Sequence, residues 1–332
     1  MEIESKRKES FGEVTLKDLL NRTTIDVGEK FKPLLKRAKG VSSLIGLDKE
    51  ILDVLASLAQ GQNVFLVGLP GTGKTTLAKE LAAAAGVPYS RTDGNEDVEP
   101  SQIVGYIDKI AVSQLGLDHP LAIEMGDMLR AHGGVYHIDE INRIPPRAAN
   151  ALLQGLEEGF LWLSGYKIVT SFVAIATINP VTFVGTYELD DALVDRFDAI
   201  WLQTPSVELL ESILKLRAKI NWDNIDMEVD EKIFRVAAKL LDLITNSYKK
   251  NEKIESPASV RAGISAINKA LAYAYLRDSN KIELEDLKKA VISSFTWRMK
   301  PSVEIGDDYQ SRKKLLEDYF EQALREVEIK WK

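Results

Sequence analysis

Residues suited to phosphate chemistry occur first in "GLPGTGKTT", residues 68–76. The stretch fits the pattern of glycine, four residues, glycine, lysine, then serine or threonine. Glycines let backbone N–H groups line a concave turn, and a helix that follows adds its positive N-terminal end. The pattern therefore predicts a phosphate-binding loop, although a glycine turn that binds nothing is the alternative. The candidate binding residues are Gly68, Pro70, Gly71, Thr72, Gly73, Lys74, Thr75 and Thr76.

Two side chains of this loop have individual predicted roles. Lys74 is expected to reach the β- and γ-phosphates, and the Thr75 hydroxyl to bind Mg²⁺. Further along the chain, the apolar run "GVYHID" ends in Asp139, and Glu140 follows it to make an acidic pair. We expect this run to be a strand of the same sheet as the phosphate loop. Asp139 is therefore predicted to lie on the metal side, and Glu140 to activate the attacking water. The alternative is a solvated strand end.

A third polar position is Asn179, at the end of the apolar run "FVAIATIN". We expect this strand to lie beside the one that carries Asp139, because ligands bind beyond the carboxyl ends of neighbouring parallel strands. The amide is therefore predicted to orient the water or to contact the γ-phosphate. Alternatively, Asn179–Pro180 only starts a turn.

The elements that position these residues are predicted from hydrophobic periodicity. Residues 41–205 contain the strand-like runs "NVFLVG", "GVYHID", "SFVAIATI" and "AIWLQT", separated by helical segments. Short apolar strands between helices predict an α/β domain with a parallel sheet covered on both faces. After Pro205 the spacing is that of amphipathic helices only, which predicts a smaller all-helical lid domain over residues 206–300. Residues 1–40 are expected to form a helical extension and residues 301–332 a helical tail.

Composition narrows the function classes. The chain has 332 residues, a net charge of −7 and no cysteine, which excludes disulfides and cysteine-bound zinc. Its three histidines do not form a ligand cluster. The acidic balance argues against a protein that wraps nucleic acid. No apolar run reaches the ~20 residues of a membrane span, and the start has no signal-peptide core, so a cytoplasmic location is expected.

Four segments in order resemble the MoxR group of AAA+ ATPases: "GLPGTGKTT", "VYHIDEINRIPPRAANALLQGLEEG", "FVAIATINPVTFVGTYELDDALVDRF" and "SPASVRAGISAINKALA". The resemblance extends from about Ser43 to Met299, so the roles of the two ends stay open. It implies a P-loop AAA+ core with a helical lid that binds and hydrolyses ATP with Mg²⁺. It also implies a homo-oligomeric ring, usually hexameric, with ATP at the subunit interfaces.

The resemblance also implies roles for individual residues. Arg196 in "LVDRF" matches the arginine that reaches into the neighbouring subunit's site, where it stabilises charge on the transferring phosphoryl group. Its alternative is a surface pair with Asp195 or Asp198. Arg261 matches the second sensor, which contacts the γ-phosphate from the lid. Residues 45–46, Ile45 and Gly46, match the segment that lies against adenine, or else pack in the core. Arg143 is expected either at the subunit interface or at a solvated helix start.

The implied function is that of a remodelling machine or chaperone with a protein client and a partner that has a von Willebrand factor A domain. The segment "EEGFLWLSGYKIV" predicts a β-hairpin with Ser164–Gly165 in its turn. Its aromatic residues and an insert over residues 101–120 are candidates for contacting a client, or for packing within the domain. Two other functions stay open, a nucleic-acid motor of the helicase type and a metal-chelatase motor subunit.

Overall fold

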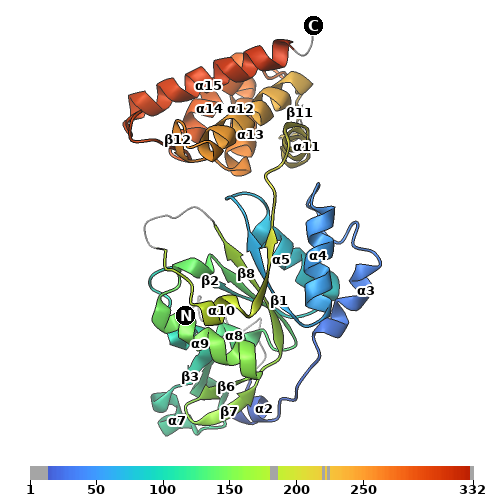
Figure 1. Cartoon of the computed structure of the whole chain (residues 1–332), viewed down its shortest axis with the longest axis vertical. Helices are drawn as coiled ribbons and strands as arrows, with labels where there is room; N and C mark the ends of the chain where they lie inside the picture. Colours follow the sequence, from blue (N-terminus) through green and yellow to red (C-terminus); the bar gives the residue numbers. More distant parts are fainter. Residues whose placement is uncertain (1–13, 180–185, 219–220, 223–224, 330–332) are drawn as a thin grey trace. The chain divides into compact units, whose positions relative to one another are not determined.

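The computed structural model describes residues 14–179, 186–218, 221–222 and 225–329 (Figure 1). Its internal contacts form two compact units. Unit 1 comprises residues 1–68 and 73–202, and unit 2 comprises residues 69–72 and 203–332. None of the helices in the described ranges combines the length and the apolar character that crossing a membrane requires.

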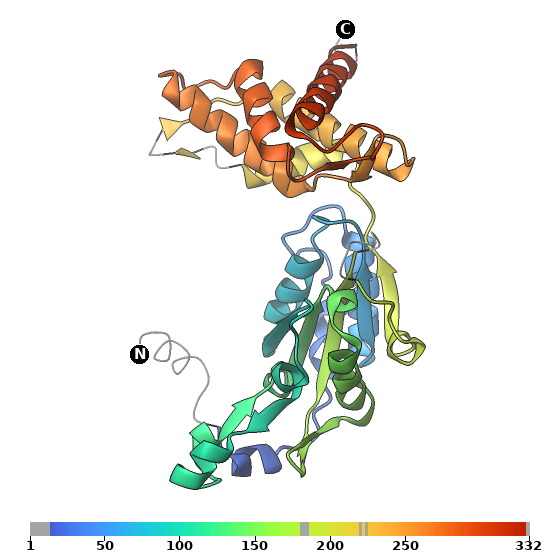
Figure 2. The same cartoon turned by 90° about the vertical axis from the view of Figure 1, so that its left-hand side faces the viewer.

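A five-stranded parallel sheet forms the centre of unit 1 (Figures 1 and 2). Its order is β2-β5-β8-β1-β9, and every neighbouring pair is parallel. The strands are β1 (Asn63–Val67), β2 (Tyr89–Asp93), β5 (Gly134–Asp139), β8 (Phe172–Ile178) and β9 (Phe197–Trp201). The predicted α/β class is confirmed. Because β8 lies beside β5, as predicted, the residues that follow these two strands meet at one edge of the sheet.

Helices cover both faces of the sheet. Successive strand residues point to opposite faces, and in β1 Val64 and Leu66 belong to one buried hydrophobic cluster while Phe65 and Val67 belong to another. The first cluster includes residues of α4 and α5, and the second includes residues of α8 and α9. These helices are α4 (Asp48–Ala59), α5 (Lys74–Ala85), α8 (Asp127–Arg130) and α9 (Pro146–Glu158). The predicted two-sided cover is therefore confirmed.

The edge strand β2 is one that the sequence pattern does not predict. Its residues alternate, with Ser90 and Thr92 buried and Arg91 and Asp93 exposed. An apolar run marks a strand buried on both faces, whereas a half-buried edge strand made of polar residues gives no such signal. At the opposite edge, β9 begins at Phe197, two residues before the run from which we predict it.

The N-terminal segment packs into unit 1. It contains α2 (Leu16–Leu20), the 3₁₀ helix η1 (Gly28–Lys30) and α3 (Lys32–Leu35). Leu16 and Leu19 of α2 belong to the cluster beneath α9, and Phe31 and Leu34 to the cluster beneath α4. Residues before the sheet therefore contribute to both of its hydrophobic layers.

His132 supports a prediction about pH. Its Nδ1 accepts a hydrogen bond from the Ser171 backbone N–H at 3.1 Å, and burial, with Arg22 nearby, lowers the pKa of His132 from 6.5 to about 4. The unfolded chain therefore takes up the proton first, and folding stability should fall as the pH drops from about 6.5 to about 4. We expect His132→Asn, which keeps an acceptor near the Nδ1 position, to make this fall shallower. Thermal unfolding across that pH range tests it, and an unchanged pH dependence would contradict it.

Two segments of unit 1 form small antiparallel strand pairs outside the five-stranded sheet. Residues 100–130 form α6 (Pro100–Val104), β3 (Gly105–Ile107), α7 (Lys109–Leu115), η2 (Pro120–Ala122), β4 (Ile123–Met125) and α8, with β3 and β4 antiparallel. The second segment is the predicted hairpin, which is confirmed as β6 (Phe160–Leu163) and β7 (Tyr166–Val169). Ser164 and Gly165 in its turn have φ values of 48° and 94°. A two-residue hairpin turn whose backbone twist matches the twist of the strands requires positive φ at both positions.

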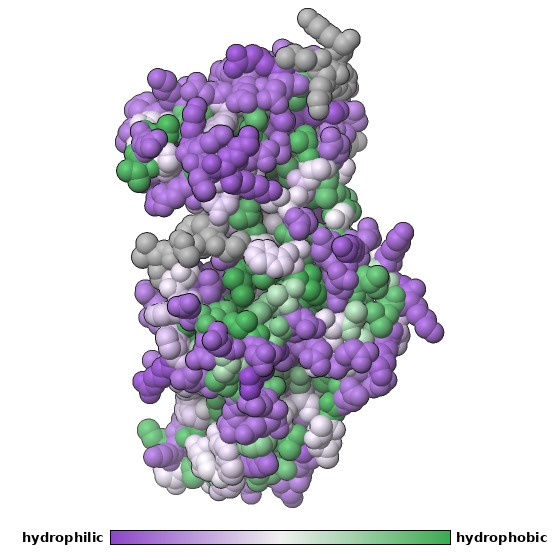
Figure 3. Space-filling view, viewed as in Figure 1, coloured by the Kyte–Doolittle hydropathy of each residue, from purple (hydrophilic) through white to green (hydrophobic). Residues whose placement is uncertain are grey.

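Unit 2 is mainly helical. Its helices are α11 (Val207–Arg217), α12 (Glu231–Lys249), α13 (Val260–Leu276), α14 (Leu284–Phe295) and α15 (Tyr309–Ile329). They share one hydrophobic core, to which α15 contributes Leu316 and Phe320. The expectation of helices alone after Pro205 is wrong in detail, because β10 (Asn221–Trp222) pairs with β11 (Ile225–Asp226), and β12 (Ile254–Ser256) with β13 (Lys300–Pro301). Such short pairs have too few residues for an alternating pattern. The face of unit 2 in Figure 3 is mostly hydrophilic.

Candidate active site

The glycine-rich loop connects β1 to α5. Gly71 and Gly73 have φ values of 86° and 94°, a region that L side chains rarely adopt, so these two positions favour glycine. Gly73 is the N-cap residue of the 12-residue helix α5, whose first N–H groups and positive dipole end favour an anion. In the same loop the buried Thr72 donates from its hydroxyl to the Leu69 carbonyl at 2.9 Å, whereas Thr76 on α5 is exposed.

Lys74 begins α5 and is almost fully buried, with 7% of its surface exposed. Its Nζ donates to the Gly68 carbonyl at 2.6 Å and to Asn179 Oδ1 at 2.8 Å. A buried ammonium group is costly unless it is hydrogen-bonded. These contacts therefore hold the charge between the end of β1 and the end of β8.

Asn179 lies between the cation and the acidic pair. It accepts from Lys74, and its Nδ2 donates to Glu140 Oε1 at 2.8 Å. The Asn179 amide therefore bonds to both Lys74 and Glu140, which follow the strands that we expected to lie beside β8. Pro180, which the turn alternative invokes, lies outside the described residues.

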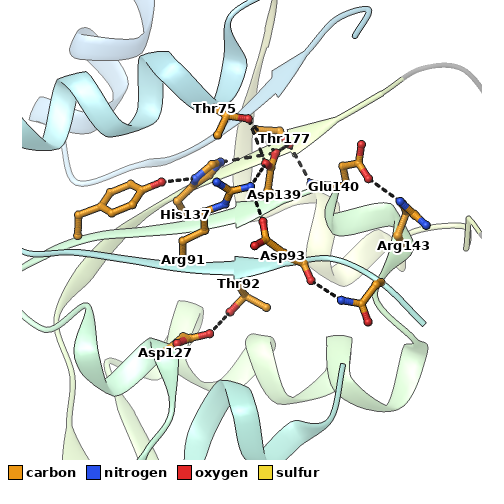
Figure 4. A network of polar contacts seen from close by, with 12 residues as sticks. Thr75, Arg91, Thr92, Asp93, Asp127, His137, Asp139, Glu140, Arg143 and Thr177 are labelled. Carbon is orange, nitrogen blue, oxygen red and sulfur yellow. Dashed lines mark hydrogen bonds and ion pairs between the residues drawn. The ribbon is translucent and has the colours of Figure 1, made fainter. Parts of the chain in front are cut away.

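Asp139 is the last residue of β5 (Figure 4). The Thr75 hydroxyl donates to its Oδ2 at 3.0 Å, the Thr177 hydroxyl to its Oδ1, and Arg91 Nη2 to its Oδ2 at 2.7 Å. Burial acts to raise the pKa of the Asp139 carboxyl, but the opposing contributions, of which the Thr177 hydrogen bond is the largest, hold the pKa below its usual value. The group is therefore an anion at neutral pH, and a hydroxyl oxygen lies beside it.

Glu140 has a strained backbone, with φ 49° and ψ 51° in the left-handed region. This conformation costs a non-glycine residue about 1–3 kcal/mol, and it tends to occur at functional sites. The Glu140 N–H donates to Thr177 Oγ1 at 2.9 Å. In the side chain, Oε1 accepts from Asn179. The other oxygen, Oε2, accepts from Arg143 Nη1 at 2.9 Å (Figure 4). Arg143 therefore contacts the predicted base within the same chain.

Three residues near the acidic pair are not predicted from the sequence. Thr177 could be found as a polar residue inside the apolar run of β8. Arg91 could be found only once β2 is recognised, as a cation two positions before Asp93, which pairs with Asp139 in the register. Gly94, after β2, donates its N–H to the Asp139 carbonyl at 2.7 Å. A Cβ at Gly94 would lie 2.2 Å from the Glu140 carbonyl oxygen, so a side chain there would displace the strained peptide.

Arg196 lies in unit 1 just before β9. Its Nη2 is 2.8 Å from Glu157 Oε2 on α9, and its Nη1 donates to the Ala192 carbonyl at 2.6 Å. The ion-pair partner is thus Glu157 of α9, whereas the sequence suggested Asp195 or Asp198. Its role in a neighbouring subunit stays a prediction.

Three further candidates are Arg261, Ile45 and Gly46. Arg261 is exposed in the first turn of α13 in unit 2, and its sensor role stays a prediction. Ile45 is half-buried, and Gly46 has a φ of 75°. In this segment it is Leu44 that packs against the hydrophobic cluster of α4 and α5.

The hairpin carries aromatic side chains at its surface. Trp162 is 53% exposed, its ring meets Phe160 edge-on with centroids 6.1 Å apart, and Lys167 Nζ lies 3.8 Å from the Phe160 ring centroid. The insert also exposes apolar residues, namely Tyr106, Ile110 and Leu115. The face of unit 1 in Figure 3 likewise shows hydrophobic residues among hydrophilic ones.

Comparison with known proteins shows similarity to a family of ATPases. Residues 63–199 match the model of the ATPase family associated with various cellular activities (AAA). The chain is 27% identical to the uncharacterized protein YeaC of Bacillus subtilis, with 78% of this chain and 85% of YeaC covered. It is also 27% identical to the gas vesicle ATPase GvpN of Haloferax mediterranei, with 77% and 75% covered.

Two further matches bear on family and fold. The chain is 29% identical to the chaperone MoxR1 of Mycobacterium tuberculosis over 46% of this chain and 39% of MoxR1. The structure of a RuvB mutant from Thermotoga maritima matches with a TM-score of 0.53 at 19% identity, with 81% of this chain and 74% of RuvB covered. That structural likeness concerns the fold alone.

Proposed function

We propose that the chain is an AAA+ ATPase of the MoxR type, which hydrolyses ATP with Mg²⁺ in a ring of identical subunits to remodel a protein client. The observation that carries the proposal is the continuous polar chain from Lys74 through Asn179 to Glu140, at 2.8 Å for each contact. It connects a phosphate-binding cation to a carboxylate at the edge of the sheet where parallel α/β folds bind ligands.

The residues present fit a magnesium ion. Mg²⁺ prefers oxygen ligands and is commonly held by one or two protein oxygens together with substrate phosphates. Thr75 Oγ1 and Asp139 Oδ2 lie 3.0 Å apart, and the carboxyl is anionic. These two residues would hold the ion, which would neutralise charge on the phosphate oxygens.

In the proposed reaction, the residues position groups and stabilise charge, without a covalent intermediate. Lys74 binds the β- and γ-phosphate oxygens. Asn179 orients the attacking water, and Glu140 accepts its proton. Arg196 serves the site of the neighbouring subunit, and Arg261 contacts the γ-phosphate from unit 2.

The client and the assembly are proposed from the comparisons and from the exposed surface. The relative named as a chaperone is matched over 39% of its length, so client remodelling, the hexamer and a von Willebrand factor A partner are proposals for this chain. The exposed Trp162 and the apolar surface of the insert favour a protein client. The hairpin strands offer one cation, Lys167, to a nucleic-acid backbone, which does not favour a nucleic-acid motor.

The test of the nucleotide site is Lys74→Ala. Hydrogen bonds to charged groups contribute roughly 1.5–3 kcal/mol each, so we expect ATP affinity to fall about 10- to 100-fold or more. Titration calorimetry with ATP and Mg²⁺ measures this directly. Lys79→Ala, an exposed lysine on the same helix, is the control and should bind normally. Unchanged affinity in Lys74→Ala would exclude this site.

A further inference from the structure

A carboxylate on the helix after the phosphate loop holds the segment that precedes α4. Glu80 of α5 accepts hydrogen bonds from the Ser43 N–H at 2.7 Å and the Ser43 hydroxyl at 2.6 Å. The Ser42 hydroxyl also donates to it. The bonds reach both carboxylate oxygens and come from two successive residues, so Glu80 fixes the position of this backbone relative to α5.

The same segment makes a second contact with the phosphate loop. The Leu44 side chain lies against Gly73, where a Cβ would be only 2.9 Å from Leu44 Cδ1. Leu44 also packs against the hydrophobic cluster shared by α4 and α5. The backbone of residues 42–44 is therefore fixed on one side by Glu80 and on the other by the end of the glycine turn.

These contacts determine where Ile45 and Gly46 lie. Residues 41–46 form neither helix nor strand, so no regular backbone hydrogen bonding sets their position. Ile45 follows the anchored Leu44 directly, is only half-buried, and precedes a glycine with positive φ. A surface held in its binding conformation before the ligand arrives has less entropy to lose on binding.

We propose that Glu80 is a positioning residue for adenine, because it holds residues 42–46 at a fixed place beside the phosphate loop. The proposal rests on the proposed function and on the expected contact of Ile45 and Gly46 with the base of the nucleotide. The affinity for the nucleotide then has two parts, one from the phosphates and one from adenine. Phosphate binding depends on the loop and Lys74, whereas adenine binding depends in addition on Glu80.

The experiment compares two ligands in the full-length chain, ATP and inorganic triphosphate, each with Mg²⁺. Glu80→Ala should weaken ATP binding about tenfold, because charge-assisted hydrogen bonds are lost. Its affinity for triphosphate should stay within about twofold of the wild type, which also shows that the variant is folded. Lys79→Ala, the exposed neighbour on α5, is the matched control and should bind both ligands normally.

A second variant tests the same contact from its other side. Ser42→Ala combined with Ser43→Ala should reproduce the selective loss of ATP affinity, and adding Glu80→Ala should cause little further loss, because interacting residues are not additive. An equal loss of both ligands in Glu80→Ala, or an unchanged affinity for both, would overturn the proposal. A wild-type chain that binds neither ligand would instead overturn the proposed function on which it rests.

Discussion

Glu140→Gln is expected to lower the rate of ATP hydrolysis by about 10²- to 10⁴-fold while ATP binding is retained, because an amide cannot accept the proton of the attacking water. Glutamine preserves the shape of the side chain and keeps an oxygen that can accept from Asn179, as Glu140 Oε1 does at 2.8 Å. The change therefore removes the base and keeps the contact with Asn179, while the contact with Arg143 is lost, because an amide nitrogen cannot accept a hydrogen bond as Oε2 does. Hydrolysis under single-turnover conditions and ATP affinity are the two measurements.

Glu96→Gln is a suitable control, because Glu96 is an exposed carboxylate in the loop after β2. It should leave both quantities unchanged. Should Glu140→Gln hydrolyse ATP at the wild-type rate, another group must be the base. Should it lose ATP binding as well, Glu140 acts through Asn179 and Lys74 on the phosphate site rather than on the water.

Arg196→Ala is expected to reduce hydrolysis by about 10³- to 10⁵-fold, the range for an arginine supplied to a phosphoryl group by a neighbouring subunit. In a single chain the guanidinium pairs with Glu157 at 2.8 Å. Serving a neighbour's site therefore requires it to leave Glu157 or to share it. If a neighbouring subunit completes the site, as proposed, the specific activity of the wild type should fall when dilution separates the subunits.

Mixing variants tests the contribution between subunits. Arg196→Ala keeps an intact phosphate site and base, and Glu140→Gln keeps an intact arginine, so their mixture should regain activity where the first receives the arginine of the second. A mixture of Lys74→Ala with Glu140→Gln should stay inactive, because each has a defective site of its own. Constant specific activity at concentrations where only monomer is present would exclude the ring mechanism.

The sequence was most informative where function depends on neighbouring residues in the chain. The phosphate loop could be predicted because its glycines, Lys74 and the start of α5 are contiguous, and positive φ is a local requirement. The adjacency of β5 and β8 was also predictable, since parallel α/β sheets bring polar residues at strand ends to one edge. From this it followed that Asn179 would lie near the acidic pair.

Contacts between distant residues were decided only by the tertiary structure. The strand β2 carries Arg91 to Asp139, but its polar residues resemble a loop. Glu157 pairs with Arg196 across 39 positions, and Glu80 holds Ser43 across 37. A charged residue on a helix surface has many possible partners, and its sequence neighbours do not reveal which one packing brings within hydrogen-bonding distance. The amino-acid sequence by itself thus determined the fold class and the candidate reacting groups, whereas the packing of helices on the sheet decided what holds each of them in place.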